Sequence, residues 1–144
     1  QAHLHIISFD IPYPANYGGA IDVFHKKDVY MLKALKLFCI ALNMAIERNR
    51  ELEALCEKVY YYKRNTSFLN QLSVLPFNVK SRINVELKHN LLKDNYPILF
   101  EVLHTCYLLN NPDLKNRKKI FRHSNIEHDY FLELAKGKTH VSQK

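Results

Sequence analysis

The chain has 144 residues and a formal net charge of +7, and 47% of its residues are hydrophobic, 12% aromatic and 24% charged. A chain of this length forms one domain that buries about two thirds of its unfolded surface without disulfide support, and this composition excludes a disordered protein. The longest apolar run, from Leu35 to Ile46, contains Lys36 and Asn43 and is shorter than the roughly twenty residues of a membrane-spanning helix, which disfavours membrane insertion.

The cysteines and the N-terminus indicate the compartment. Cys39, Cys56 and Cys106 are an odd number, form no Cys-x-x-Cys pair and lie in apolar surroundings, so we expect buried, reduced thiols and no zinc site. The first residues lack the charged, apolar and small-residue order of a signal peptide. Together these features predict a cytoplasmic protein.

The first part of the chain has the layout of an anion-binding site. The run from His5 to Gly19 predicts a buried strand that leads into a loop ending in Gly18 and Gly19, and helical spacing of apolar residues begins at Ala20. Glycine lets the backbone approach a ligand closely, and the N–H groups of a first helical turn attract negative groups. The loop therefore suggests a phosphate-bearing ligand, although a Gly-Gly turn before a helix is more often a turn alone.

The rest of the chain alternates between strand and helix patterns. Near-continuous apolar or β-branched runs predict strands, and apolar residues at intervals of three or four predict helices. The predicted strands are residues 36–43, 59–62, 97–103 and 119–122, and the predicted helices are residues 47–58, 79–93 and 126–136. We therefore predict an α/β fold, a Rossmann-like sandwich built on an open parallel sheet.

Polar clusters follow three of the predicted strands. They are residues 13–19, 101–106 and 122–128. Because ligands of open parallel sheets bind beyond the carboxyl ends of the strands, we expect these three clusters to meet at one edge.

Four sequence phrases resemble a known family. Residues 9–19 (FDIPYPANYGG), 55–62 (LCEKVYYY), 100–105 (FEVLHT) and 122–128 (RHSNIEH) resemble the N-terminal domain of bacterial glycosyltransferases of the GT-B fold, in particular the retaining family-four type of Bacteroides-like bacteria. The resemblance extends over nearly the whole chain. Its most specific parts are the proline-rich strand exit that ends in Gly-Gly and the Asn-Ile-Glu-His segment.

The resemblance implies one half of a two-domain enzyme. Residues 1–138 would form the N-terminal, acceptor-side domain and residues 139–144 a tail, while the donor-binding C-terminal domain, with its Glu-x7-Glu motif, is expected outside this chain. This half alone is then expected to be inactive. The whole enzyme would transfer a hexosyl group from a nucleotide sugar to a cell-envelope glycan or lipid-linked acceptor.

The resemblance also implies roles for individual residues. It places two carboxylates and a histidine in position to accept a hydroxyl proton or bind an acceptor hydroxyl, and a second group against substrate and phosphates. The expected catalytic residues are Glu101, His123 and Glu127. The expected substrate- and phosphate-binding residues are Tyr17, Gly18, Gly19, His104, Arg122, Asn125 and His128.

The expected partners follow from the same resemblance. The donor nucleotide sugar is a substrate, so no cofactor is expected, and the carboxylates and histidines show no metal-ligand spacing. The basic charge suits an anionic membrane surface at the inner face of the cytoplasmic membrane. The alternative is a non-enzymatic nucleic-acid-binding domain, based on the charge and on the basic cluster formed by Lys115, Arg117, Lys118, Lys119 and Arg122. A regulatory domain of flavodoxin-like type is a third reading.

Overall fold

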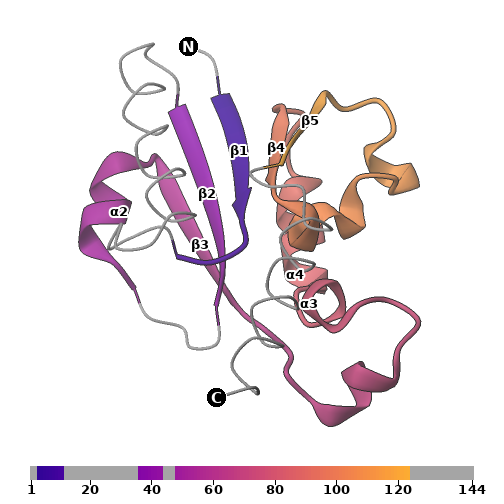
Figure 1. Ribbon diagram of the computed structural model, residues 1–144. Helices are drawn as coiled ribbons and strands as arrows, with labels where there is room; N and C mark the ends of the chain where they lie inside the picture. Colours follow the sequence, from indigo (N-terminus) through magenta and orange to yellow (C-terminus); the bar gives the residue numbers. More distant parts are fainter. Residues whose placement is uncertain (1–2, 12–35, 44–47, 124–144) are drawn as a thin grey trace, which may run out of the picture.

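The computed structural model describes residues 3–11, 36–43 and 48–123 (Figure 1). It contains five strands: β1 (His3–Ser8), β2 (Lys36–Asn43), β3 (Lys58–Lys63), β4 (Ile98–Glu101) and β5 (Lys119–Arg122). They form one sheet in the order β3-β2-β1-β4-β5, and every neighbouring pair is parallel. Strands β2 and β3 follow on one side of β1, and β4 and β5 follow on its other side. This is the Rossmann arrangement, so the predicted α/β fold is confirmed.

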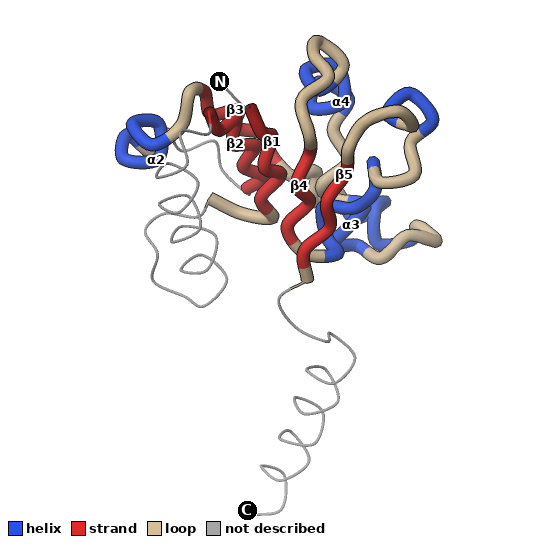
Figure 2. Tube along the Cα trace, turned by 90° about the horizontal axis from the view of Figure 1, so that it is seen from above, coloured by secondary structure: helices blue, strands red, loops and turns tan. Residues whose placement is uncertain are grey.

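The helical elements are short and lie on both sides of the sheet (Figure 2). They are α2 (Arg50–Leu55), α3 (Phe77–Lys80) and α4 (Val85–Leu91), with 3-10 turns η1 (Phe68–Leu72), η2 (Leu103–Leu108) and η3 (Pro112–Leu114). Strand β3 shows the two faces directly. The Tyr61 hydroxyl accepts a hydrogen bond from the backbone N–H of Asn49 at the start of α2, whereas the Tyr62 hydroxyl accepts one from Asn90 of α4. Successive side chains of a strand point to opposite faces, so α2 and α4 cover different faces.

The main core lies on the face that α4 covers. Ile7, Ile98 and Phe100 from the strands pack there with Leu87 and Leu91 of α4. A smaller cluster of Leu4, Ile6 and Leu99 lies on the other face. The two clusters follow the alternation along β1 and β4, which is expected of strands covered on both sides.

Two of the predicted strands, residues 36–43 and 119–122, have the bounds of β2 and β5. The helix predicted over residues 79–93 is wrong as a single element, because α3 ends at Lys80 and α4 begins at Val85. The Asn84 side chain accepts a hydrogen bond from the Leu87 N–H, so Asn84 caps a new helix.

The helix predicted over residues 47–58 is shorter in the structure. It begins after Asn49, whose side chain caps it by accepting a hydrogen bond from the Leu52 N–H, and it ends at Leu55. Strand β1 ends at Ser8 because the Ser8 hydroxyl donates to the Asp10 carbonyl and turns the chain. The helices predicted from Ala20 and over residues 126–136 lie outside the described residues.

Candidate functional site

The carboxyl ends of β1, β4 and β5 meet at one edge of the sheet. These three strands are parallel neighbours, with β1 paired to β4 and β4 paired to β5. The exit of β1 at residues 9–11, the exit of β4 at residues 102–105 and the end of β5 at residues 122–123 therefore lie along the same edge. We call this edge, with the side chains on it, the carboxyl rim.

Glu101 and Arg122 form the central ion pair of the carboxyl rim. The sheet register sets the two residues opposite each other, and Arg122 Nε donates to Glu101 Oε2 at 2.6 Å. The Glu101 side chain is 1% exposed and that of Arg122 is 22% exposed. A buried carboxylate that accepts a hydrogen bond from a guanidinium fixes the arginine in place. In this geometry Glu101 positions Arg122, and its expected proton-accepting role stays a prediction.

Val102 turns the chain at the end of β4. Its backbone has φ 61° and ψ 165°, a region that a β-branched residue adopts only under strain. Its N–H donates to the Arg122 carbonyl at 2.9 Å, and the Thr105 hydroxyl donates to the carbonyls of Glu101 and Val102. The turn places the half-buried His104 in η2, on the carboxyl rim.

Arg82 is a rim residue that the sequence analysis missed. Its side chain reaches from the end of α3 to the exit of β1, where Nε donates to the Phe9 carbonyl at 3.0 Å, and Nη1 donates to the Asn78 carbonyl at 2.7 Å. Arg82 is 5% exposed. It ties the backbone that leads toward the predicted glycine loop to α3. No strand-end pattern marks Arg82, because it follows a helix.

Arg64 is a second missed rim residue, and it follows β3 directly. Its guanidinium donates to the Ser81 hydroxyl, with Nη2 at 2.9 Å. Burial lowers the pKa of Arg64, and the charge of Asp10 at the exit of β1 opposes that shift. An arginine with a lowered pKa is still protonated at neutral pH. The strand-end rule, applied to β3, would have found it.

His123 lies at the end of the described chain and is exposed. Its ring packs edge-on against Phe121, with the ring centroids 5.7 Å apart. The structure thus places four of the predicted site residues, Glu101, His104, Arg122 and His123, along the carboxyl rim. The other six lie outside the described residues: Tyr17, Gly18, Gly19, Asn125, Glu127 and His128.

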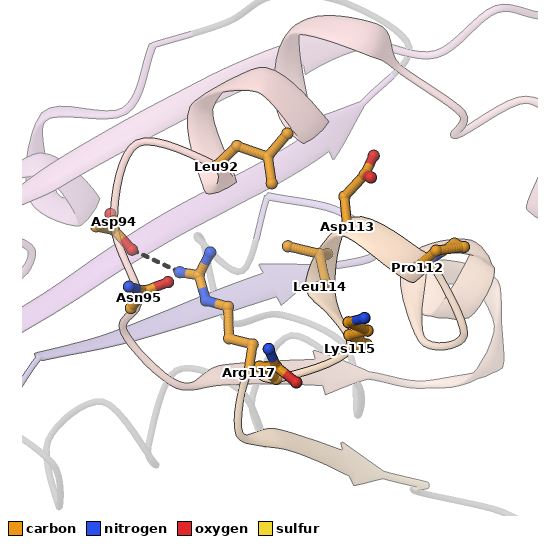
Figure 3. A pocket seen from close by; sticks show the side chains of 9 residues that line it. Leu92, Asp94, Asn95, Pro112, Asp113, Leu114, Lys115 and Arg117 are labelled. Carbon is orange, nitrogen blue, oxygen red and sulfur yellow. Dashed lines mark hydrogen bonds and ion pairs between the residues drawn. The ribbon is translucent and has the colours of Figure 1, made fainter.

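A pocket of about 510 Å³ lies at the opposite edge of the sheet, before β4 and β5 (Figure 3). The Arg117 side chain forms part of the pocket wall. Its guanidinium donates to Asp94 Oδ1 at 2.5 Å and to the carbonyls of Tyr96 and Leu91. Asp94 also contacts His5 Nε2 at 2.9 Å. Burial lowers the pKa of Arg117, and Asp94 opposes this. Arg117 is therefore a structural tie between the segments that precede β4 and β5.

The basic cluster proposed for nucleic acid is divided by the fold. Arg117 is buried in the tie just described, Arg122 pairs with Glu101, and Lys119 Nζ donates to the Leu109 carbonyl at 2.7 Å. Lys115 and Lys118 remain exposed. Three of the five cations thus serve internal contacts, which does not favour a nucleic-acid interface.

Cys56 and Cys106 are the cysteines whose side chains the structure describes. Cys56 and Cys106 are unbridged and half-buried, which corrects the expectation that they are buried, and the side chain of Cys39 lies outside the description.

Within residues 3–11, 36–43 and 48–123 no group of three His, Cys, Asp or Glu side chains could hold a metal ion. In the same residues, no helix has the length and apolar character needed to cross a bilayer.

Comparison with known proteins gives one informative match. The whole chain aligns at 30% identity, over 152 aligned positions, with an uncharacterized 44.6 kDa protein in the cps region of Klebsiella pneumoniae. The chain spans 39% of the length of that relative. No protein-family model and no solved structure matches the chain.

Proposed function

We propose that the chain is the acceptor-side, N-terminal domain of a retaining GT-B glycosyltransferase that transfers a hexosyl group during the assembly of a cell-envelope polysaccharide. The observation that carries the proposal is that Arg122 at the end of β5, Arg82 at the exit of β1 and Arg64 at the end of β3 all lie on the carboxyl side of a Rossmann-like sheet. Ligands of such sheets bind at this edge.

The relative supports the biological setting. Its name places it in the cps region, a capsule gene region, and capsules are cell-envelope polysaccharides. The chain corresponds to 39% of that protein, a share that suits one of two domains of similar size. A role in polysaccharide synthesis is the coarse statement that this match supports, and sugar transfer is the finer proposal made here.

The rim suits the charge that develops in sugar transfer. As the bond to the donor diphosphate breaks, negative charge collects on the leaving phosphates, and preorganised cations stabilise it. Arg122, held by Glu101 and partly exposed, is the described side chain best placed for this role. Arg82 positions the exit of β1, from which the chain continues toward Gly18 and Gly19. Glu101, His123 and Glu127 remain the proposed acceptors of the hydroxyl proton. The enzyme would act at the inner face of the cytoplasmic membrane.

The test uses the whole gene product that contains this chain, a panel of nucleotide sugars and a lipid-linked acceptor fraction from the source cells. Arg122→Gln should lower kcat/KM about a hundredfold, because it removes a charge that acts on the leaving group. The matched control is Arg48→Gln, since the Arg48 side chain is 77% exposed and pairs with Glu53 away from the rim. Full activity in a folded Arg122→Gln protein, or no transfer from any nucleotide sugar, would refute the proposal.

A further inference from the structure

The connection between β3 and α4 carries the most exposed apolar surface of the described chain. Phe68 is 68% exposed, Leu69 and Leu72 are each 74% exposed, Val74 is fully exposed at 104%, and Leu75 is 44% exposed. We call residues 68–75 the apolar loop. Five of the eleven exposed large hydrophobic side chains of the described residues fall within it. A concentration of this kind marks an interaction site.

The apolar loop projects beyond the carboxyl edge of the sheet. In Figure 1 the magenta-to-pink segment between β3 and α3 extends away from the sheet and from the other labelled elements. Its five exposed apolar side chains therefore lie on a protrusion. Apolar side chains on a protrusion are able to enter the interface of a lipid bilayer.

Hydrogen bonds within the apolar loop and to its flanking residues hold its conformation. The Ser67 N–H donates to Asn65 Oδ1, Asn70 Nδ2 donates to the Asn65 carbonyl, and the Leu75 N–H donates to the Ser73 hydroxyl. The Asn65 N–H donates to the Ser81 carbonyl at 2.7 Å and anchors the loop to α3. Groups already paired in this way cost less to remove from water, which favours entry into a lipid interface.

The charged residues in the sequence that contains the apolar loop are all positive. From residue 63 to residue 83 the sequence contains Lys63, Arg64, Lys80 and Arg82 and no acidic residue. The Arg64 guanidinium donates to the neutral Ser81 hydroxyl. The acidic neighbour is Asp10, whose charge acts on Arg64. Apolar side chains flanked by cations are the composition that binds anionic bilayers.

We propose that the apolar loop, residues 68–75, inserts into the interface of an anionic lipid bilayer while Lys63 and Lys80 contact lipid headgroups. This inference names the surface that would meet the membrane in the proposed function, but lipid binding requires neither donor nor acceptor sugar. Flotation with vesicles and sugar transfer are separate measurements, so either proposal can fail without the other.

The first test is flotation of the chain with vesicles of phosphatidylcholine alone or with about 30% phosphatidylglycerol. The chain should float with the anionic vesicles, and raising the salt from about 50 mM to about 500 mM should weaken binding. The triple variant Phe68→Ser/Leu69→Ser/Leu72→Ser should bind about tenfold or more weakly. The control Val85→Ser/Leu92→Ser removes two exposed apolar side chains from the α4 region and should bind within about twofold of the parent chain.

A second variant tests insertion of the apolar loop independently, in case the triple variant misfolds. The chain contains no tryptophan, so Phe68→Trp introduces a single fluorescent reporter. Its emission should shift to the blue with anionic vesicles, whereas the emission of Val85→Trp should not. Absence of flotation with anionic vesicles at low salt, or an unshifted Phe68→Trp emission, would overturn the proposal. Conversion of a dimer into a monomer by the triple variant, measured by light scattering, would also overturn it by making the loop a self-association surface.

Discussion

Glu101 on β4 and Arg122 on β5 are register partners in the parallel sheet, and their side chains join at 2.6 Å where the two strands end. The pair lies on the carboxyl rim with the backbone turn at Val102 directly beside it. A charged pair at this place orders the end of β5, from which the chain leads to His123 and the predicted Asn-Ile-Glu-His segment. The pair therefore links the stability of the sheet edge to the geometry of the proposed site.

Removing the buried partner of this pair should destabilise the fold. Glu101→Ala leaves Arg122 without its carboxylate, and we expect the free energy of unfolding in urea to fall by about 3 kcal/mol. The control is Glu53→Ala, because Glu53 and Arg48 form an exposed pair with side chains 32% and 77% exposed. That loss should stay below about 1 kcal/mol. Equal losses in the two variants would contradict the structural role of the Glu101 pair.

The conformation of Val102 should reverse the usual order of stability between a glycine and an alanine variant. At φ 61° and ψ 165° a Cβ atom is strained, and glycine alone adopts this region freely. We therefore expect Val102→Gly to be more stable than Val102→Ala by about 1 kcal/mol, measured by urea unfolding, although both variants lose the buried side chain.

The control for this comparison is Val59, a half-buried valine in β3. Within the described residues only Val102 has a positive φ among non-glycine residues, so Val59 has ordinary strand geometry. There the usual order should hold, with the glycine variant less stable than the alanine variant by about 0.5–1 kcal/mol. An alanine variant that is also the more stable one at position 102 would show that the turn is unstrained.

The sheet was readable from the sequence because its strands are compact apolar runs. Residues 36–43 have almost no polar interruption, and residues 119–122 are bounded by polar neighbours, so both sets of bounds were predicted. Residues 79–93 carry the pattern of a single helix because Ile83, Leu87 and Leu91 keep a four-residue interval across the break between α3 and α4. The Asn84 cap, a side chain bonded to a backbone N–H three residues later, interrupts the helix without disturbing that interval.

The rim was predictable only in part for a related reason. The rule that ligands bind at strand ends identified Glu101 and Arg122, and the structure places both there. The same rule is silent on Arg82, whose long side chain crosses from α3 to the Phe9 carbonyl. It also cannot reveal that Glu101 and Arg122 are register partners, because register depends on the pairing of strands far apart in the sequence.

His5 should make the fold less stable in mild acid. Burial lowers the pKa of His5 below its ordinary 6.5, and the hydrogen bond and charge of Asp94 oppose that shift only in part. Below about pH 6.5 the unfolded chain binds a proton at His5 that the folded chain excludes, so stability is full above this pH and falls as the pH drops toward the folded pKa. Urea unfolding at about pH 7.5 and pH 5 measures the loss.

The variant His5→Gln separates this contribution from that of other groups. Glutamine cannot take up a proton in this range, so the difference in unfolding free energy between the two pH values should be smaller in the variant than in the parent chain. An unchanged difference would mean that His5 does not contribute to acid destabilisation.

Cys106 should be an unreactive thiol in the folded chain. Burial raises its pKa from 9.0 to about 11, and the hydrogen bond with Thr105 opposes this only in part. Its Sγ also donates to the Val102 carbonyl at 3.4 Å, a contact that only the protonated thiol makes. Since the thiolate is the nucleophile, alkylation by iodoacetamide at about pH 8 should be roughly a hundredfold slower than in the chain unfolded in guanidinium. Mass spectrometry of the peptide containing Cys106 measures both rates, and equal rates would place the thiol outside the packed turn that follows β4.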